Sequence, residues 1–296
     1  MLSTRQLRYF VEIAECGSFS AAAERLFIAQ SALSRQIKDM ETRLQTPLFE
    51  RTARQPRLTA AGEAFLPRAR NLLNELNKAS TMATEIGNGQ RGTLRLSHSS
   101  TVPISGRLLA AISVYIEQQA GVSLDIGKLS SEAQLEELAE GRLDIGLLRL
   151  PVLRQREGIQ VVSLFTERLL LAVPAGHRLA DAKIVDLAQL KDEPFISIPH
   201  PQRGGLSYLC AELCMRQGFF PQPARVMSRK TTQLQLIQGG FGIALLPESM
   251  QDIAPSGVRF LALADPDCQS TVALAYRQNP TPLVQHFLQT FTDECL

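Results

Sequence analysis

Apolar residues recur every three or four positions in three stretches of the first sixty residues, and this spacing predicts three short helices. The turn Cys16-Gly17 ends the first helix, and Ser18 is expected to cap the second, which reads FSAAAERL. The third helix, QSALSRQIKDMETRL, begins only a few residues later. Its expected inward stripe is Leu33, Ile37, Met40 and Leu44.

The outward face of the third helix is polar and basic near its start. It carries Gln30, Ser31, Ser34, Arg35 and Lys38. Two short helices joined by a turn of three or four residues, the second exposing such side chains, describe a helix-turn-helix with a recognition helix. Arginine bonds guanine and glutamine bonds adenine in a bidentate way, whereas serine and lysine suit phosphates or base edges. Any amphipathic helix also turns polar residues outward, so this helix alone leaves both interpretations open.

A basic stretch after Pro47 favours the nucleic-acid interpretation. In the extended segment ERTARQPRLT, an arginine recurs every three residues, at Arg51, Arg54 and Arg57. Such a row is expected of a wing that lies along a phosphate backbone. The charge distribution agrees, because residues 1–91 carry a net charge of +4 and the remainder carries −2.

A long helix is predicted from Thr59, a good N-cap, to Ile86, with Pro67 as its only interruption. Its apolar residues alternate at intervals of four and three, as in a coiled coil, and are Phe65, Ala69, Leu72, Leu76, Ala79, Ala83 and Ile86. At about 42 Å, such a helix is too long to be buried against one small domain. We expect its stripe to meet a second copy, with help from other contacts because the alanines bury little area. A helix packed only on its own domain is the alternative.

From residue 93 onward, predicted strands and helices alternate, which indicates βαβ units on a largely parallel sheet. TLRLS, VSLDIG and LDIGLL read as strands, and the same order returns after Phe165. We expect two α/β lobes that share a cleft, with the chain crossing near Val162 and returning near Asp267.

Ligands of open α/β folds bind at the carboxyl ends of strands, where helix N-termini also point. Three such places carry polar side chains: residues 97–101, Ser130 with Ser131, and the loop 199–205. Helix N-termini beside hydroxyls favour an anion, and a carboxylate fits better than a phosphate because no basic cluster converges. Ser131 is expected to form a capping box with Gln134, and capping alone is the alternative role for Ser131 and Thr101.

Composition narrows the class of protein. The 296 residues are 45% hydrophobic and 20% charged, as in a soluble globular protein with more than one domain. No stretch is long and apolar enough for a membrane span and the N-terminus lacks a signal-peptide layout, so we expect a cytoplasmic protein. Five scattered cysteines and four histidines form neither a disulfide framework nor a zinc motif, so no metal or cofactor is expected.

Other functions find weaker support. A hydrolase would need His98, Ser99 and Ser100 to act with Asp125 or Asp144, but no G-x-S-x-G elbow is present, and we do not expect an enzyme. A solute-binding or sensor protein without DNA binding is a second alternative. A redox switch through Cys210 and Cys214 is a third, although cysteines four apart on one helix are marginal for a disulfide.

The run from LRYFVEIAECGSF to LTAAGEAFL resembles the winged helix-turn-helix of the LysR-type transcriptional regulators nearly position for position, and the resemblance extends over the whole chain. IAQSALSRQI, GRLDIGLLRLPV and PFISIPHPQRGG look closest to the subgroup that controls catabolism of aromatic compounds and responds to benzoate, muconate or phenylpropenoic acids. The resemblance implies an all-α winged helix-turn-helix, a linker helix and a two-lobed α/β effector domain like periplasmic binding proteins. The implied boundaries are 1–58 for the DNA-binding domain, 59–91 for the linker and dimerisation helix with its hinge, and 92–296 for the effector domain. Within the effector domain, lobe I comprises 92–161 and 268–296, and lobe II comprises 162–267.

The resemblance also implies site residues. The DNA-contacting set is Ser20, Gln30, Ser31, Ser34, Arg35 and Lys38, with Arg51 and Arg54 on the wing. The effector-binding set is Ser99, Ser100, Thr101, Ser131, Arg149, His200, Gln202, Arg203, Thr231 and Thr232. The chain departs from the family pattern at Ser31, where proline is frequent. It also departs at residues 97–99, where small or apolar residues are usual. Here Ser97, His98 and Ser99 make the cleft more polar.

Partners follow from the same resemblance. They are double-stranded operator DNA, a small carboxylate effector, RNA polymerase and further copies of the chain, in pairs that commonly assemble as tetramers. Promoter activation is the more common mode in the family, so an activator is expected.

Overall fold

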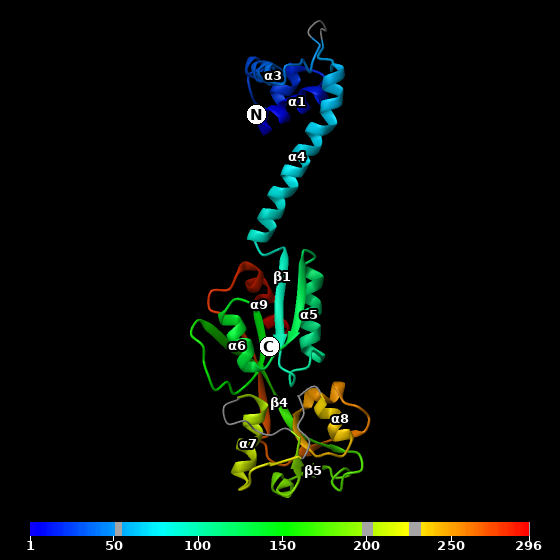
Figure 1. Ribbon diagram of the computed structural model, residues 1–296, viewed down its shortest axis with the longest axis vertical. Coiled ribbons are helices and arrows are strands. Elements are labelled where there is room, and N and C mark those ends of the chain that lie inside the picture. Colours follow the sequence, from blue (N-terminus) through cyan, green and yellow to red (C-terminus); the bar gives the residue numbers. More distant parts are fainter. Residues whose placement is uncertain (51–54, 197–203, 225–231, 296) are drawn as a thin grey trace. The chain divides into compact units, whose positions relative to one another are not determined.

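The computed structural model describes residues 1–50, 55–196, 204–224 and 232–295, the last four of these by backbone alone, and it divides into two compact units, Met1–Glu85 and Ile86–Leu296 (Figure 1). No helix in this described part is both long and apolar enough to cross a membrane.

Three helices form the core of the N-terminal unit. They are α1 (Thr4–Cys16), α2 (Phe19–Arg25) and α3 (Gln30–Leu44). The Ser18 side chain accepts a hydrogen bond from the Ala21 N–H at 3.3 Å, which confirms the predicted cap of α2. The Phe10 ring packs at the centre of the unit, 5.5 Å from the Phe49 ring and 5.4 Å from the Phe65 ring. These aromatic contacts join the first helix to the segments that follow α3.

The segment after α3 is held to that helix by one carboxylate. Glu41 Oε1 accepts hydrogen bonds from the N–H groups of Leu48, at 2.7 Å, and Phe49, at 3.0 Å. Phe49 then pairs with Leu58 in an antiparallel bridge, the start and end of the predicted wing. Arg51 and Arg54 lie outside the described residues.

The long helix α4 spans Ala60–Gly87, 28 residues, and continues through Pro67. Thr59 Oγ1 accepts a hydrogen bond from the Gly62 N–H at 3.1 Å, as its predicted role as N-cap requires. The predicted apolar stripe has two parts. Ala69 is buried and Phe65 packs on the core of the N-terminal unit. The remaining members of the stripe are exposed, Leu72, Leu76 and Ile86 to 57%, 47% and 55%. The start of the stripe therefore packs on its own domain, and the rest is left without a partner within the described residues of this chain.

The C-terminal unit begins with lobe I. Its elements are β1 (Gly92–His98), α5 (Gly106–Gln118), β2 (Val122–Lys128), α6 (Ser131–Ala139), β3 (Ile145–Arg149) and α9 (Pro282–Cys295). The strand order is β2-β1-β3-β10, with β1 parallel to both neighbours (Figure 1). Alternate residues of β3 point to opposite faces, so Leu147 packs with α5 and α9 and Leu148 packs with α6.

Two long strands connect lobe I to lobe II. They are β4 (Ile159–Pro174) and β10 (Gln269–Arg277). The first part of β4, up to Arg168, pairs antiparallel with β10, and the part from Leu169 pairs with β8 and β9. Lobe II is built from β5 (Ile184–Val185), β6 (Pro194–Phe195), α7 (Leu206–Arg216), β7 (Gln222–Pro223), α8 (Gln233–Gln238), β8 (Ala244–Pro247) and β9 (Val258–Leu263), with the 3-10 helices η1 (Leu187–Leu190) and η3 (Glu248–Ile253).

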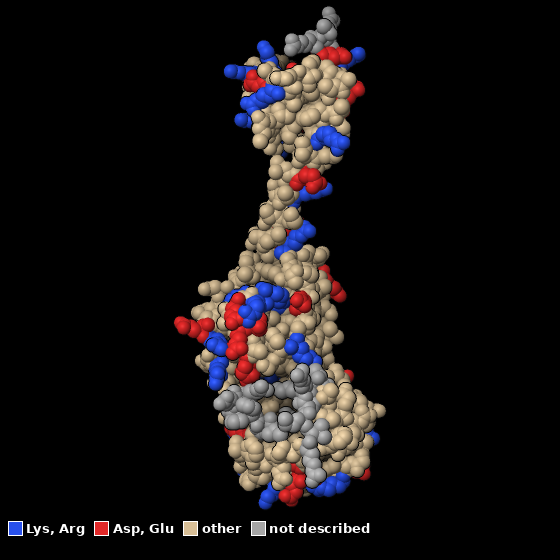
Figure 2. All heavy atoms as spheres, in the orientation of Figure 1, with Lys and Arg blue, Asp and Glu red and all other residues tan. Residues whose placement is uncertain are grey.

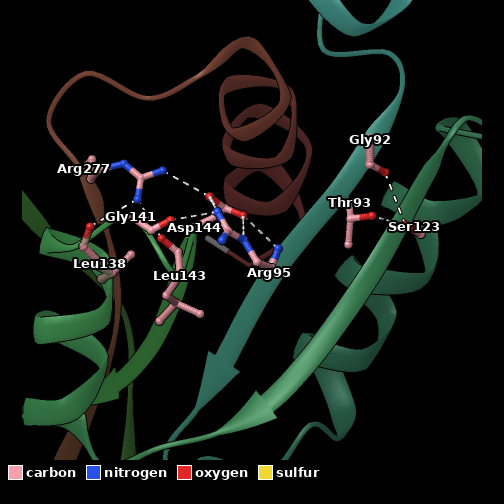
Figure 3. A network of polar contacts seen from close by, with 9 residues as sticks. All are labelled: Gly92, Thr93, Arg95, Ser123, Leu138, Gly141, Leu143, Asp144 and Arg277. Atoms are coloured by element: carbon pink, nitrogen blue, oxygen red, sulfur yellow. Dashed lines mark hydrogen bonds and ion pairs between the residues drawn. The ribbon is translucent and has the colours of Figure 1, made fainter.

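A buried carboxylate links β1, β10 and the start of β3 in lobe I (Figure 3). Asp144 accepts hydrogen bonds from Arg95 Nε, at 3.0 Å, and from Arg277 Nη2, at 3.1 Å. Burial alone would raise the pKa of the Asp144 carboxyl, but the bonds from Arg95 and Arg277 outweigh it and hold this pKa below its ordinary value of 3.8. The charge of Asp144 thus ties β1 and β10 to the start of β3.

We expect Asp144→Asn to lower the free energy of unfolding of the C-terminal unit by about 2 kcal/mol at pH 7, because two guanidinium groups lose their counter-charge while partial exposure of Arg95 screens the loss. The depressed pKa means that the carboxylate stabilises the fold at neutral pH and loses this effect as the pH falls below about 4. The difference between wild type and Asp144→Asn should therefore shrink on acidification. Urea unfolding followed by circular dichroism measures it, with the exposed Asp192→Asn as the control. A difference that stays constant down to pH 3 would contradict the assignment.

Candidate functional site

The third helix, α3, has one buried and one exposed face. Of the predicted inward stripe, Leu33, Ile37 and Met40 are buried, and Leu44 is partly buried against the same core. On the opposite face Gln30, Ser31, Arg35 and Lys38 are exposed, and Ser34 is half-buried. Ser20 is exposed on α2. The predicted DNA-contacting residues within the described part of the chain are thus all accessible.

The exposed basic side chains of α3, Arg35 and Lys38, are free of ion pairs with the described residues. Arg25 pairs with Glu12 and Arg70 with Glu15, both at 3.0 Å, but Arg35 and Lys38 form no ion pair with any described residue. No side chain caps the N-terminus of α3, because its N-cap residue is Ala29. An uncapped helix start followed by unpaired cations favours the phosphate groups of a nucleic acid. Figure 2 shows Lys and Arg side chains projecting from the N-terminal unit.

One exposed residue at this surface was missed by the sequence analysis. Phe27, in the turn between α2 and α3, is 95% exposed and adopts a left-handed backbone conformation with φ of 54°. Such a conformation is costly for a bulky residue and is often found at functional sites. The only sequence signal is an aromatic residue at a position outside either helical stripe.

The second candidate site lies where lobe I meets lobe II. Ser99 and Thr101 follow β1, are both buried, and have hydroxyl oxygens 3.2 Å apart. Ser131 Oγ accepts a hydrogen bond from the Arg149 N–H at 3.4 Å. On the other side, the Gly205 N–H at the start of α7 donates to the Pro151 carbonyl at 2.6 Å. The predicted effector residues 99, 101, 131 and 149 are therefore brought together, next to the start of a lobe II helix.

The Arg149 guanidinium is bound within the protein. The side chain is 1% exposed, and it donates to Ser270 Oγ at 2.6 Å, to the Thr101 carbonyl and to Glu167 Oε1 at 2.8 Å. Burial lowers the pKa of Arg149, and the charge of Glu167 opposes this shift. The Arg149 side chain thus holds the backbone carbonyl of Thr101 and forms an ion pair with Glu167 on β4.

The remaining predicted effector residues divide into two groups. Ser100 is half-buried beside Thr101, and Thr232 is the N-cap residue of α8. His200, Gln202, Arg203 and Thr231 lie outside the described residues.

The predicted capping box of Ser131 with Gln134 is wrong. Ser130 is the N-cap of α6, and its side chain accepts from the Ala133 N–H at 3.3 Å. The Gln134 side chain turns inward and donates to the Leu129 carbonyl at 3.0 Å. The Ser131 hydroxyl is consequently not used for capping its own helix, and it faces Arg149 and Gly205 instead.

A cavity of about 320 Å³ lies beside this cluster and contains none of the predicted effector residues. Its wall comes from the start of α5 in lobe I, from residues 165–168 of β4, and from Glu248, Ser249 and Asp252 of η3 in lobe II. These segments lie far apart in the sequence, so no local pattern could reveal the cavity.

The cysteines of lobe II are poorly suited to a redox switch. Cys210 and Cys214 are buried and not joined by a disulfide. Burial raises the pKa of the Cys214 thiol to about 11 and that of Cys268 to about 12. Thiols that stay protonated at neutral pH are poor nucleophiles, so this alternative loses support.

Comparison with known proteins identifies both units. Residues 4–63 match the family model "Bacterial regulatory helix-turn-helix protein, lysR family", and residues 87–296 match "LysR substrate binding domain". YnfL of Escherichia coli K12, described as an uncharacterized HTH-type transcriptional regulator, is 31% identical over 97% of this chain and 96% of its own length. BenM of Acinetobacter baylyi, an HTH-type transcriptional regulator, is 31% identical over 93% of this chain and 90% of its own.

Solved structures agree with the sequence matches. CbnR, a LysR family transcriptional regulator whose full-length structure was determined in complex with its target DNA, superposes with a TM-score of 0.83 and 26% identity over 99% of this chain and 100% of CbnR. The family consists of DNA-binding regulators and not of enzymes. With both of its units matched, the chain belongs to the LysR family of transcriptional regulators.

Proposed function

We propose that this LysR-family protein activates transcription when a small carboxylate binds between the two lobes of its C-terminal unit. The observation that carries the DNA-binding part is the exposed row on α3, where Gln30, Arg35 and Lys38 point outward and neither cation forms an ion pair with a described residue. These are side chains that read base edges and neutralise phosphates. RNA polymerase is the partner through which an activator would act.

A carboxylate effector is supported by the chemistry of the interlobe cluster, by which we mean Ser99, Thr101, Ser131 and Arg149. Ser99, Thr101 and Ser131 contribute buried hydroxyls, and that of Ser131 lies beside the start of α7, whose N-cap residue Gly205 has no side chain to cap it. Hydroxyls and the positive end of a helix stabilise a single negative charge without a full counter-charge. Arg149 is already paired with Glu167, so a strongly charged phosphate would find no free cation among the described residues of this cluster. Aromatic carboxylates, the effectors of the subgroup that the sequence resembles, are the first candidates.

Regulation would follow from linkage between the lobes. An effector that binds one arrangement of the lobes better than another can shift their equilibrium only by that difference in affinity. Lobe II already contacts lobe I through Gly204, whose N–H donates to Glu132 Oε1 at 2.6 Å. An effector seated beside this contact would favour the arrangement in which it is formed.

Dimerisation is supported by the exposed part of the α4 stripe. Leu72, Leu76 and Ile86 remain about half exposed, an unfavourable arrangement for an isolated helix in water. Pairing of two such helices would bury them, and the alanines between them permit close approach. We propose that the chain pairs through this stripe, and that two pairs form a tetramer.

The recognition helix is tested by selecting binding sites from randomised duplex DNA with the full-length protein. Arg35→Ala should weaken binding to the selected site by about 1 to 3 kcal/mol and relax its sequence preference, because a base contact is lost. Lys38→Ala should weaken all duplexes alike and reduce the salt dependence, as expected of a phosphate contact. Arg68→Ala, an exposed arginine on α4, serves as the matched control. Unchanged affinity and preference in Arg35→Ala would refute the role of α3.

Pairing through α4 is tested with Leu76→Asp. Burying a leucine from each copy contributes about 1.5 to 3 kcal/mol per side chain, so a buried charge should weaken the dimer at least about a hundredfold. Sedimentation velocity over a concentration series measures the change. Asn74→Asp introduces the same charge beside the stripe and should leave association unaltered. Equal behaviour of the two variants would exclude this interface.

The effector site is tested by thermal unfolding of the full-length protein with benzoate, muconate and phenylpropenoic acids. A ligand at 100 times its Kd stabilises the native state by about 2.7 kcal/mol, which raises the unfolding temperature by several degrees. Thr101→Ala should abolish this shift, whereas Thr93→Ala, whose hydroxyl bonds Ser123 on the exposed surface of the same lobe, should retain it. A shift that survives in Thr101→Ala would place the ligand elsewhere, and no shift with any of these acids would argue against an aromatic effector.

A further inference from the structure

The cavity beside the interlobe cluster has the form of a ligand site. Its volume of about 320 Å³ lies at the small end of the range of about 300 to 1,000 Å³ that is usual for small-molecule sites. Val102 and Leu108 of lobe I and Phe165 and Val272 of the crossing strands give it apolar walls. Charged side chains from both lobes also line it.

Most of the charges around the cavity neutralise one another. Arg168 pairs with Glu248 at 2.8 Å, and Glu167 pairs with Arg149 at 2.8 Å. These pairs leave one cation and one anion. Arg107 lies over the Phe165 ring, 4.5 Å from its centre, and forms no ion pair with a described residue.

The remaining anion is Asp252 on lobe II. It accepts a hydrogen bond from the Ser105 hydroxyl at 2.9 Å, and within the described segments it has no cationic partner. Ser105 is two residues from Arg107, so the unpaired anion and the unpaired cation lie at the same end of α5 but do not pair with each other. A ligand that carries both signs of charge could satisfy both.

The N-terminus of α5 adds partial positive charge to the part of the cavity near Arg107. Ser105 is the N-cap residue, yet its hydroxyl bonds Asp252 and caps no N–H group of α5. The first N–H groups of this 13-residue helix therefore have no side-chain partner, and they favour a carboxylate next to Arg107. From lobe II, the cavity is also lined by Ser249, whose buried hydroxyl has no hydrogen-bond partner in the part of the chain that the structure describes. It is a further group with which a polar ligand could bond.

We propose that this cavity binds a small zwitterion with an apolar side chain, that is, an apolar α-amino acid. Its carboxylate meets Arg107 and the start of α5, its ammonium group meets Asp252, and its side chain lies against Val102, Leu108 and Phe165. A simple carboxylic acid would leave Asp252 facing a second negative charge, and a simple amine would leave Arg107 unpaired.

The site is built from both lobes, so its occupation has a conformational consequence. Arg107 belongs to lobe I and Asp252 to lobe II, and a ligand held between them stabilises the arrangement in which Ser105 reaches Asp252. The amino acid would thus act on the same equilibrium as the carboxylate effector, from a separate site.

Titration calorimetry with the full-length protein tests this proposal. The probes are L-valine, L-leucine, L-isoleucine, L-methionine and L-phenylalanine, with L-phenylalaninamide and N-acetyl-L-phenylalanine as analogues that carry only the positive or only the negative charge. At least one amino acid should bind, and for L-phenylalanine each analogue should bind about tenfold more weakly or worse. Arg107→Gln and Asp252→Asn should each weaken amino-acid binding by about tenfold or more.

Matched controls separate this site from the effector site and from general charge effects. Arg154→Gln and Asp181→Asn remove exposed charges outside the cavity wall and should leave the affinity unchanged, as should Thr101→Ala. Absence of binding by all five amino acids at millimolar concentration would overturn the proposal. Equal affinity for the N-acetyl analogue together with a silent Asp252→Asn would show a site for simple anions. Loss of binding in Thr101→Ala alone would show that the amino acid occupies the interlobe cluster.

Discussion

The arrangement of the C-terminal unit depends on the contacts that the Glu167 carboxylate makes with both lobes. One of its oxygens accepts from Arg149 of lobe I at 2.8 Å, and the other accepts from the Ser249 N–H of lobe II at 2.8 Å. Glu167 itself lies on β4, the strand that belongs to the sheets of both lobes. Because Arg149 is almost completely removed from water, it requires this counter-charge, and loss of either partner would leave a charge buried alone.

The ion pair between Arg149 and Glu167 contributes to both candidate ligand sites, the interlobe cluster and the cavity. Arg149 fixes the backbone at Thr101 on one side, and Glu167 forms part of the cavity wall on the other. The two sites are therefore neighbours that share one ion pair while using different side chains for recognition. A strand shared by two sheets also fixes the register of both, since a shift by one residue would reverse the faces of β4 in each lobe.

Local features of the structure could be predicted from the sequence, and long-range ones could not. The two faces of α3 and the cap at Ser18 follow from helical periodicity and from hydrogen bonds that span only three or four residues. The error at Ser131 has a local cause, because two serines in succession offer two possible caps and packing turns Gln134 inward. The pairing of Arg149 with Glu167 and the meeting of Ser105 with Asp252 depend on how the lobes are assembled, which no spacing of residue types encodes.

The contact made by Glu41 has a consequence for how DNA is read. One carboxylate oxygen of Glu41 accepts hydrogen bonds from two successive N–H groups, so α3, the helix that we propose reads the bases, is bonded directly to the segment that leads into the predicted wing. The return of the wing is bonded as well, since the Thr59 N–H donates to the Leu48 carbonyl at 2.9 Å. The end of α3 and the described segments that lead into and out of the predicted wing are consequently held together by hydrogen bonds. In the proposed dimer, adaptation to operators with different spacings would then occur in the DNA between half-sites or in the connection between the two copies, and not between α3 and the base of the wing.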